Sequence, residues 1–205
     1  MGERQRKNER RRTSKLQGNV LEFPPGGRFK RAGSRQTDRG QLSLFPAQIL
    51  ALPVLNPYEQ AVRFDEAGEA GKARALYLEA IGSNTNAADA HCNLGILESK
   101  DGRTVDALEC FARALAVDPE HAESHYNMAL VYLQEEDYRL ARLHFELSYR
   151  LDPAPQALYC LGVAHAFGGE TGSAMEVLAR YKDLVTEEER EKADALLEQL
   201  ERQLD

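Results

Sequence analysis

Residues 88–121 read ADAHCNLGILESKDGRTVDALECFARALAVDPEH, and this stretch decides the fold because its pattern recurs along the chain. Ala107 lies near its centre. Ala73, Ala141 and Ala174 stand at equivalent places, so that successive alanines are 34, 34 and 33 residues apart. A period near 34 residues that keeps small and aromatic residues in phase indicates a repeated helical hairpin.

Two further sets of residues recur with the alanines. Large residues follow each alanine by four positions: Tyr77, Phe111, Phe145 and Leu178. Small residues precede each alanine by twelve positions: Ala61, Gly95, Ala129 and Gly162. A small residue lets the first helix of a pair approach the second closely, and the large residue fills the space between one pair and the next. The spacing therefore predicts stacked pairs of antiparallel helices.

These residues resemble the tetratricopeptide repeat (TPR) family. The unit at 88–121 matches best, through Leu94, Gly95, Ala107, Phe111 and Pro119. The resemblance implies an all-α, TPR-like solenoid of about four helix-turn-helix repeats, at residues 54–87, 88–121, 122–154 and 155–183, within a repeat domain at 56–185. We expect Asn56 and Glu59 to form a capping box where this domain begins.

The C-terminal residues 186–205 form a separate predicted unit. Thr186 and Glu189 have the spacing of a capping box, and an apolar stripe follows on an otherwise charged segment. The stripe comprises Val185, Ala193, Leu196, Leu197, Leu200 and Leu204. A repeat array needs a terminal helix with one apolar and one polar face, so the stripe favours a capping helix over a short dimerising coiled coil.

The charge is divided unevenly along the chain. Residues 1–45 carry 12 Lys or Arg and 4 Asp or Glu, whereas residues 46–205 carry 14 and 29. Residues 1–40 show no sustained apolar period, so we expect 1–55 to be a disordered basic tail followed by an apolar linker. Such an arm is typical of a segment that meets a polyanion or folds back on its own acidic domain.

The cysteines and the apolar segments of the sequence indicate the cellular compartment. The three cysteines, Cys92, Cys110 and Cys160, form no close pair, which is typical of a reducing environment. The most apolar stretch, residues 42–55, contains Pro46 and Pro53 and is shorter than the roughly 20 residues of a membrane helix. We therefore expect a cytoplasmic protein with no membrane partner and no signal peptide.

Catalytic chemistry has little support in the sequence. His91 and His125 are 34 residues apart, which permits either a metal pair or two residues that pack at the edge of the core. Two such ligands with no third at helical spacing make a poor metal site. The cysteines are better explained as packing residues than as nucleophiles. We predict no catalytic residue, no metal and no cofactor, and hence no enzyme.

The family resemblance instead implies a binding groove. In TPR proteins one face of each first helix lines a concave channel that holds an extended peptide. The corresponding residues here are Tyr58, Val62, Asn93, Ile96, Tyr126, Asn127, Leu130, Tyr159 and Val163, with Cys92, Leu133 and Phe167 beside them. Acidic residues lie at the margins: Asp65, Glu66, Asp89 and Glu123.

The predicted function is that of a non-enzymatic adaptor or scaffold that binds a protein or peptide partner in this groove. An apolar channel with acidic edges suits a peptide with hydrophobic anchors and positive charge. Asn93 and Asn127 match the family's position for holding a ligand backbone, although ordinary surface asparagines are the alternative.

A second hypothesis places the activity in the tail. Gln41, Leu42, Ser43, Leu44 and Phe45 resemble the peptide by which bacterial replication and repair proteins dock on the DNA sliding clamp. The alternative is an apolar linker that packs on the first repeat. The basic run between Arg4 and Lys15 fits weak, non-specific contact with nucleic acid, a solubilising tail, or a tail that inhibits the groove.

Overall fold

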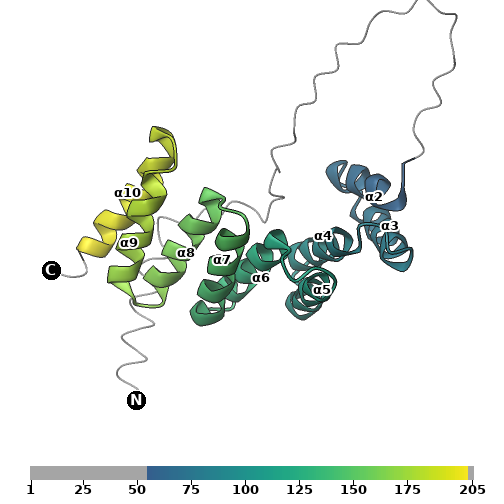
Figure 1. Cartoon of the computed structure of the whole chain (residues 1–205), viewed down its shortest axis with the longest axis horizontal. Coiled ribbons are helices and arrows are strands. Elements are labelled where there is room, and N and C mark those ends of the chain that lie inside the picture. Colours follow the sequence, from purple (N-terminus) through teal and green to yellow (C-terminus); the bar gives the residue numbers. More distant parts are fainter. Residues whose placement is uncertain (1–54, 203–205) are drawn as a thin grey trace, which may run out of the picture.

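The computed structural model describes residues 55–202, which form four helix pairs and a closing helix. The pairs are α2 (Pro57–Glu66) with α3 (Ala70–Gly82), α4 (Ala87–Lys100) with α5 (Thr104–Val117), α6 (Ala122–Gln134) with α7 (Tyr138–Leu151), and α8 (Pro155–Phe167) with α9 (Thr171–Lys182). Helix α10 (Glu187–Glu201) packs on α9. Figure 1 shows the pairs succeeding one another from α2 and α3 to α10. The predicted solenoid with a capping helix is confirmed.

The helix ends follow from local sequence. The Glu59 N–H donates to Asn56 Oδ1 over 2.9 Å, and the Asn56 N–H donates to the Glu59 carboxylate over 3.0 Å. Pro57 follows at the first helical position, where its missing N–H costs nothing. At α10, the Thr186 N–H donates to the Glu189 carboxylate over 3.3 Å. Both capping boxes therefore form where their spacing predicts them.

The turn within each pair uses one left-handed residue at an equivalent place. Three of these residues are glycines, Gly68, Gly102 and Gly169, with φ of 77°, 75° and 79°. The fourth is Glu136, with φ of 60°. A side chain at this φ costs about 1 kcal/mol relative to glycine, so the turn between α6 and α7 carries local strain.

The link between α3 and α4 differs from the links that follow α5 and α7. Helix α3 ends at Gly82, which is its last residue. The chain then reverses through Asn84 and Asn86, whose φ values are 53° and 50°. Asparagine tolerates this region better than most residues, which explains how the link forms without the proline that follows α5 and α7.

Two small residues of the repeat lie directly against the large residue of the partner helix. A Cβ placed on Gly95 would lie 2.6 Å from Phe111 Cε1, and a Cβ on Gly162 would lie 2.8 Å from the Leu178 side chain. Phe111 is 1% exposed and Leu178 is completely buried. Glycine is therefore required at these two positions by the large residue of the partner helix.

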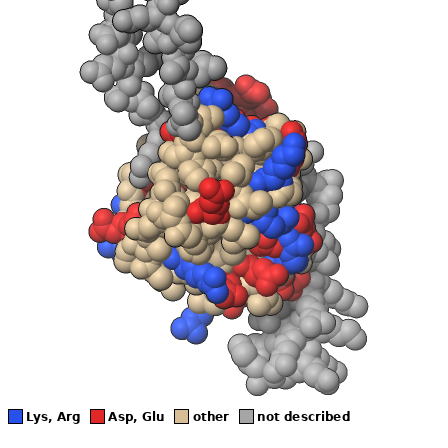
Figure 2. Space-filling model, turned by 90° about the vertical axis from the view of Figure 1, so that its right-hand side faces the viewer, with Lys and Arg blue, Asp and Glu red and all other residues tan. Residues whose placement is uncertain are grey.

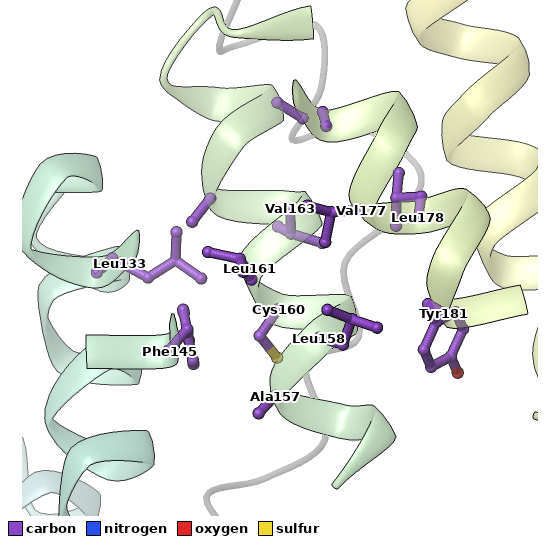
Figure 3. Close-up of a cluster of buried hydrophobic side chains, with 14 of the residues drawn as sticks. Leu133, Phe145, Ala157, Leu158, Cys160, Leu161, Val163, Val177, Leu178 and Tyr181 are labelled. Carbon is purple, nitrogen blue, oxygen red and sulfur yellow. The ribbon is translucent and has the colours of Figure 1, made fainter. Parts of the chain in front are cut away.

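The buried hydrophobic residues form three clusters, and each cluster contains residues of more than one helix pair. Leu133 and Phe145 of the third pair pack in the same cluster as Leu161 of α8 and Leu178 of α9 (Figure 3). Helix α10 extends this cluster with three buried residues, Ala193, Leu196 and Leu200. This burial explains how α10 closes the array, as its apolar stripe predicts.

Candidate functional site

The first helices of the four pairs carry the candidate site. We call the first-helix face the surface formed by Tyr58, Val62, Asn93, Ile96, Tyr126, Asn127, Leu130, Tyr159 and Val163. These residues belong to α2, α4, α6 and α8. Their contacts and exposure define the chemical character of this face.

Lateral polar contacts link consecutive first helices. Asn93 Nδ2 donates to Tyr58 Oη over 3.3 Å, which links α4 to α2. Asn127 Nδ2 lies 3.8 Å from Cys92 Sγ and links α6 to α4. Tyr126 Oη lies 3.6 Å from Cys160 Sγ and links α8 to α6. These lateral contacts join residues 34 or 35 positions apart, so they place side chains in the same register along the array.

Most of the first-helix face is closely packed. Asn93 is 4% exposed and Asn127 is 3% exposed, so neither is the surface asparagine that the alternative interpretation supposes. Asn127 Nδ2 also donates to the Glu123 carbonyl oxygen over 2.9 Å. Within the described residues the Oδ1 atoms of both asparagines accept no hydrogen bond. The two asparagines are therefore buried members of the face whose Nδ2 atoms make its lateral contacts.

The remaining members of the face differ in exposure. Ile96, Tyr126, Leu130 and Val163 are buried. Tyr58, Val62 and Tyr159 are half-buried, and all three lie on the first and last of the four first helices. The accessible side chains therefore stand at the two ends of the face, with the asparagines between them.

The cysteines contribute packing. Burial raises the pKa of the Cys160 thiol to about 12 and also raises the pKa of Cys92 well above its usual range. Cys110 is half-buried, and desolvation raises its pKa to about 11. Since the thiolate is the nucleophilic form, these three thiols are poorly suited to covalent chemistry near neutral pH.

Charge is segregated between the two kinds of helix. The four first helices carry six Asp or Glu and two Lys or Arg, whereas their four partners carry five and eight. Helices α6 and α8 contain neither Lys nor Arg. At the α2–α3 end of the array, an uncharged area is bordered by Lys and Arg side chains interspersed with Asp and Glu (Figure 2). The first helices therefore carry an excess of negative charge and their partner helices an excess of positive charge.

Two of the acidic margin residues also support the fold. Asp89 Oδ1 lies 3.1 Å from His121 Nε2, and the Tyr77 hydroxyl donates to Asp65 Oδ2 over 3.3 Å. Glu66 is exposed at the end of α2, and Glu123 lies in the first turn of α6. These four acidic residues therefore place negative charge at the margins of the first-helix face.

The histidines pair differently from the sequence hypothesis. His125 Nδ1 lies 3.0 Å from His144 Nδ1 of α7, and Tyr132 stacks on His144 at 5.6 Å between ring centroids. His91 Nδ1 is buried without a hydrogen-bond partner in the described residues. Across residues 55–202, no three His, Cys, Asp or Glu side chains converge in a way that would hold a metal ion.

Sequence reasoning missed three ion pairs that link neighbouring helix pairs. Glu98 of α4 forms ion pairs with Arg74 of α3 and with Arg103, and Arg74 also contacts Asp101 over 2.8 Å. At the other end of the array, Arg142 of α7 contacts Glu170 over 2.8 Å. The partners from different helix pairs are 24 to 28 residues apart, a separation that no helical spacing marks in the sequence.

Comparisons with known proteins agree with this geometry. Two models described as "Tetratricopeptide repeat" match residues 86–154 and 126–189. The chain belongs to the tetratricopeptide repeat family. No curated protein matches the sequence of this TPR chain.

Solved TPR structures share the fold. MamA from AMB-1 superposes with a TM-score of 0.61 at 21% identity, covering 72% of this chain and 86% of that one. The second TPR domain of human RPAP3, in complex with the HSP70 peptide SGPTIEEVD, gives 0.51 at 25% identity, covering 56% and 94%. The first TPR of Spaghetti (RPAP3), bound to the HSP90 peptide SRMEEVD, gives 0.53 at 20% identity, covering 57% and 92%.

Other sequence predictions fall outside the described residues. The clamp-like motif (Gln41, Leu42, Leu44 and Phe45) and the basic run between Arg4 and Lys15 lie there, so clamp and nucleic-acid binding stay predictions. Between residues 55 and 202, no helix combines the length and apolar character needed to cross a membrane.

Proposed function

We propose that this TPR protein is a non-enzymatic adaptor that holds an extended peptide segment of a partner protein along the first-helix face. The observation that carries the proposal is the set of lateral contacts that aligns α2, α4, α6 and α8 in one register. The RPAP3 domain, which shares the fold at 25% identity, has a peptide in its complex and supports the same use of the fold here.

The asparagines and the partly accessible apolar residues bind different parts of the peptide. The Oδ1 atoms of Asn93 and Asn127 accept N–H groups of the peptide backbone, which gives affinity for any extended segment. Tyr58, Val62 and Tyr159 receive apolar side chains of the peptide, since they remain partly accessible. Tyrosine suits this role because its ring offers apolar area and its hydroxyl a hydrogen bond.

Charge sets the class of peptide. The RPAP3 partners SGPTIEEVD and SRMEEVD are rich in acidic residues. The first helices of this chain carry an excess of Asp and Glu, so an acidic peptide meets repulsion here. The preferred partner segment therefore combines Lys or Arg with apolar anchors.

The test is selection from a displayed library of random 15-residue peptides against the immobilised full-length chain. Peptides rich in Lys, Arg and large apolar residues are expected, with binding lost in Val62→Asp and Tyr159→Ala. Val105→Ala and Leu143→Ala are matched controls, because both residues are exposed on second helices. Selected peptides that bind the face variants and the wild type equally would refute the proposal.

A further inference from the structure

We propose that the chain's own residues 28–45 occupy the first-helix face and compete with partner peptides. The inference rests on the proposed function, because the same face is used. The inference names an occupant of the face and a form of regulation. Both follow from the place where the chain enters the described structure and from the charge of residues 28–45.

Residues 28–45 have the composition that the face favours. They include five Lys or Arg (Arg28, Lys30, Arg31, Arg35 and Arg39) and one acidic residue, Asp38. Leu42, Leu44 and Phe45 follow as apolar anchors. The more N-terminal basic run, residues 4–15, carries seven Lys or Arg and no Leu, Ile, Val, Phe or Tyr. Residues 28–45 therefore combine positive charge with apolar anchors, whereas residues 4–15 have the positive charge alone.

The chain leaves the described structure at the face itself. Gln60 Nε2 donates to the Leu55 carbonyl oxygen over 2.7 Å, which ties Leu55 to the first turns of α2. Tyr58, the first residue of the face, stands three positions later. A segment that precedes Leu55 therefore starts next to the surface that it must reach.

The length of the connection is sufficient. An extended chain spans roughly 3.3 Å per residue, so the ten residues from Phe45 to Leu55 reach about 33 Å. Packed helices are roughly 10 Å apart, so the four first helices extend on the order of 30 Å. Residues 28–45 can therefore lie anywhere along the face, and their tether to Leu55 keeps their effective concentration high.

Charge complementarity supports residues 28–45 as the occupant. Glu66 of α2 and Glu123 of α6 flank the face, and α6 and α8 carry no Lys or Arg that would repel the arm. The attraction acts between charges near the surface and is weakened by salt. A partner with tighter contacts displaces the arm, so the chain is inhibited until such a partner is present.

The test is a titration of a fluorescein-labelled peptide of residues 28–45 with the full-length chain, followed by fluorescence anisotropy. The arm variant R31E/R35E/R39E/L44S/F45S, in the full chain, is expected to bind this peptide at least about tenfold more tightly than the wild type. When the arm occupies the face, the apparent affinity of the chain for the labelled peptide falls in proportion to the fraction of chains whose face is open. Equal affinities would overturn the inference.

Two controls locate the binding. Adding E66K/E123K to the arm variant is expected to abolish binding of the peptide, whereas adding E146K/E176K, at exposed positions of α7 and α9, is expected to retain it. A labelled peptide of residues 1–18 is expected to bind at least tenfold more weakly. If E66K/E123K leaves the affinity unchanged, the arm does not bind this face. Thermal melts monitored by circular dichroism check that each variant is folded.

A spin label separates binding within one chain from binding between copies. The label is attached at Ser43→Cys in a Cys110→Ser background, since Cys92 and Cys160 are buried. Broadening of α4 and α6 amide signals is expected within the labelled chain and absent when the label and the observed isotope are on different molecules. Broadening in the mixed sample would overturn the intramolecular inference. If display-selected peptides still need Val62 and Tyr159, the proposed function survives any of these failures.

Discussion

Phe111 occupies the space that a side chain at residue 95 would need, because a Cβ on Gly95 would lie 2.6 Å from Phe111 Cε1. Gly95→Ala is therefore expected to destabilise the fold by roughly 1–3 kcal/mol, as overpacking of a tight core does. Urea denaturation measures this cost. Gly71→Ala is the control, since its Cβ meets nothing within 4 Å, and a loss as large as that of Gly95→Ala would contradict the packing explanation.

Phe111→Ala tests the same contact from the other side. Phe111 is buried between its own pair and the next, together with Met128 and Val131 of α6. Its truncation is expected to cost roughly 3–5 kcal/mol, a large share of the stability of a small domain. In the double variant Gly95→Ala with Phe111→Ala, the cost of the alanine at 95 should largely disappear. Additive costs would show that the two residues do not share one space.

Glu136→Gly is expected to stabilise the protein by roughly 0.5–1 kcal/mol. Glu136 holds a φ of 60° at the place where the other three turns have glycine. Glycine removes the steric cost of this conformation, although part of the gain is offset by its greater freedom when unfolded. Thermal denaturation measures the change. Gly102→Ala is the reciprocal control and should lower the melting temperature. A lower melting temperature for Glu136→Gly than for the wild type would show that Glu136 carries no backbone strain.

Stability is expected to fall as the pH drops from 6.5 toward 4. Burial, with a smaller effect of His125, lowers the pKa of His144 to about 4, below the value near 6.5 of an unfolded chain. Between pH 6.5 and 4 the unfolded chain takes up a proton at His144 that the folded chain does not, so acid favours unfolding. The full contribution of neutral His144 to the free energy of unfolding is present above pH 6.5. The slope should be less than about 1.4 kcal/mol per pH unit, since His144 is only half-buried.

His144→Phe is the matched variant for this pH dependence. Phenylalanine keeps a ring that can stack on Tyr132, which lies 5.6 Å away, but it cannot titrate. Melting temperatures of the two proteins between pH 7 and pH 4.5 are compared. We expect a shallower decline for the variant. Parallel curves would show that His144 does not govern the acid sensitivity.

The fold could be predicted from the sequence because its determinants repeat. The position of Gly95 relative to Phe111 recurs with a period near 34 residues, and Asn56 with Glu59 marks the first helix by a local rule. The turn at Glu136 follows the same period without the glycine that would have marked it. Repetition thus supplies information that one helix pair alone does not contain.

The contacts between pairs could not be predicted in the same way. The hydrogen bond from Asn93 to Tyr58 depends on the rotation of one pair against the next, and so does the contact between His125 and His144. At the start of α6, His121 accepts a hydrogen bond from the Ser124 N–H over 3.1 Å. Ser, Thr, Asp or Asn usually fills this N-cap role. These features depend on three-dimensional register, which residue spacing leaves open.

The central claim, that the first-helix face binds an extended peptide, is tested most directly by amide chemical shifts of the isotope-labelled full-length chain. A display-selected basic, apolar peptide is titrated into the protein. The account predicts the largest shifts at Asn93, Asn127 and Tyr159, with little change at Val105 and Leu143 on the second helices. Shifts confined to the second helices or to α10 would contradict it.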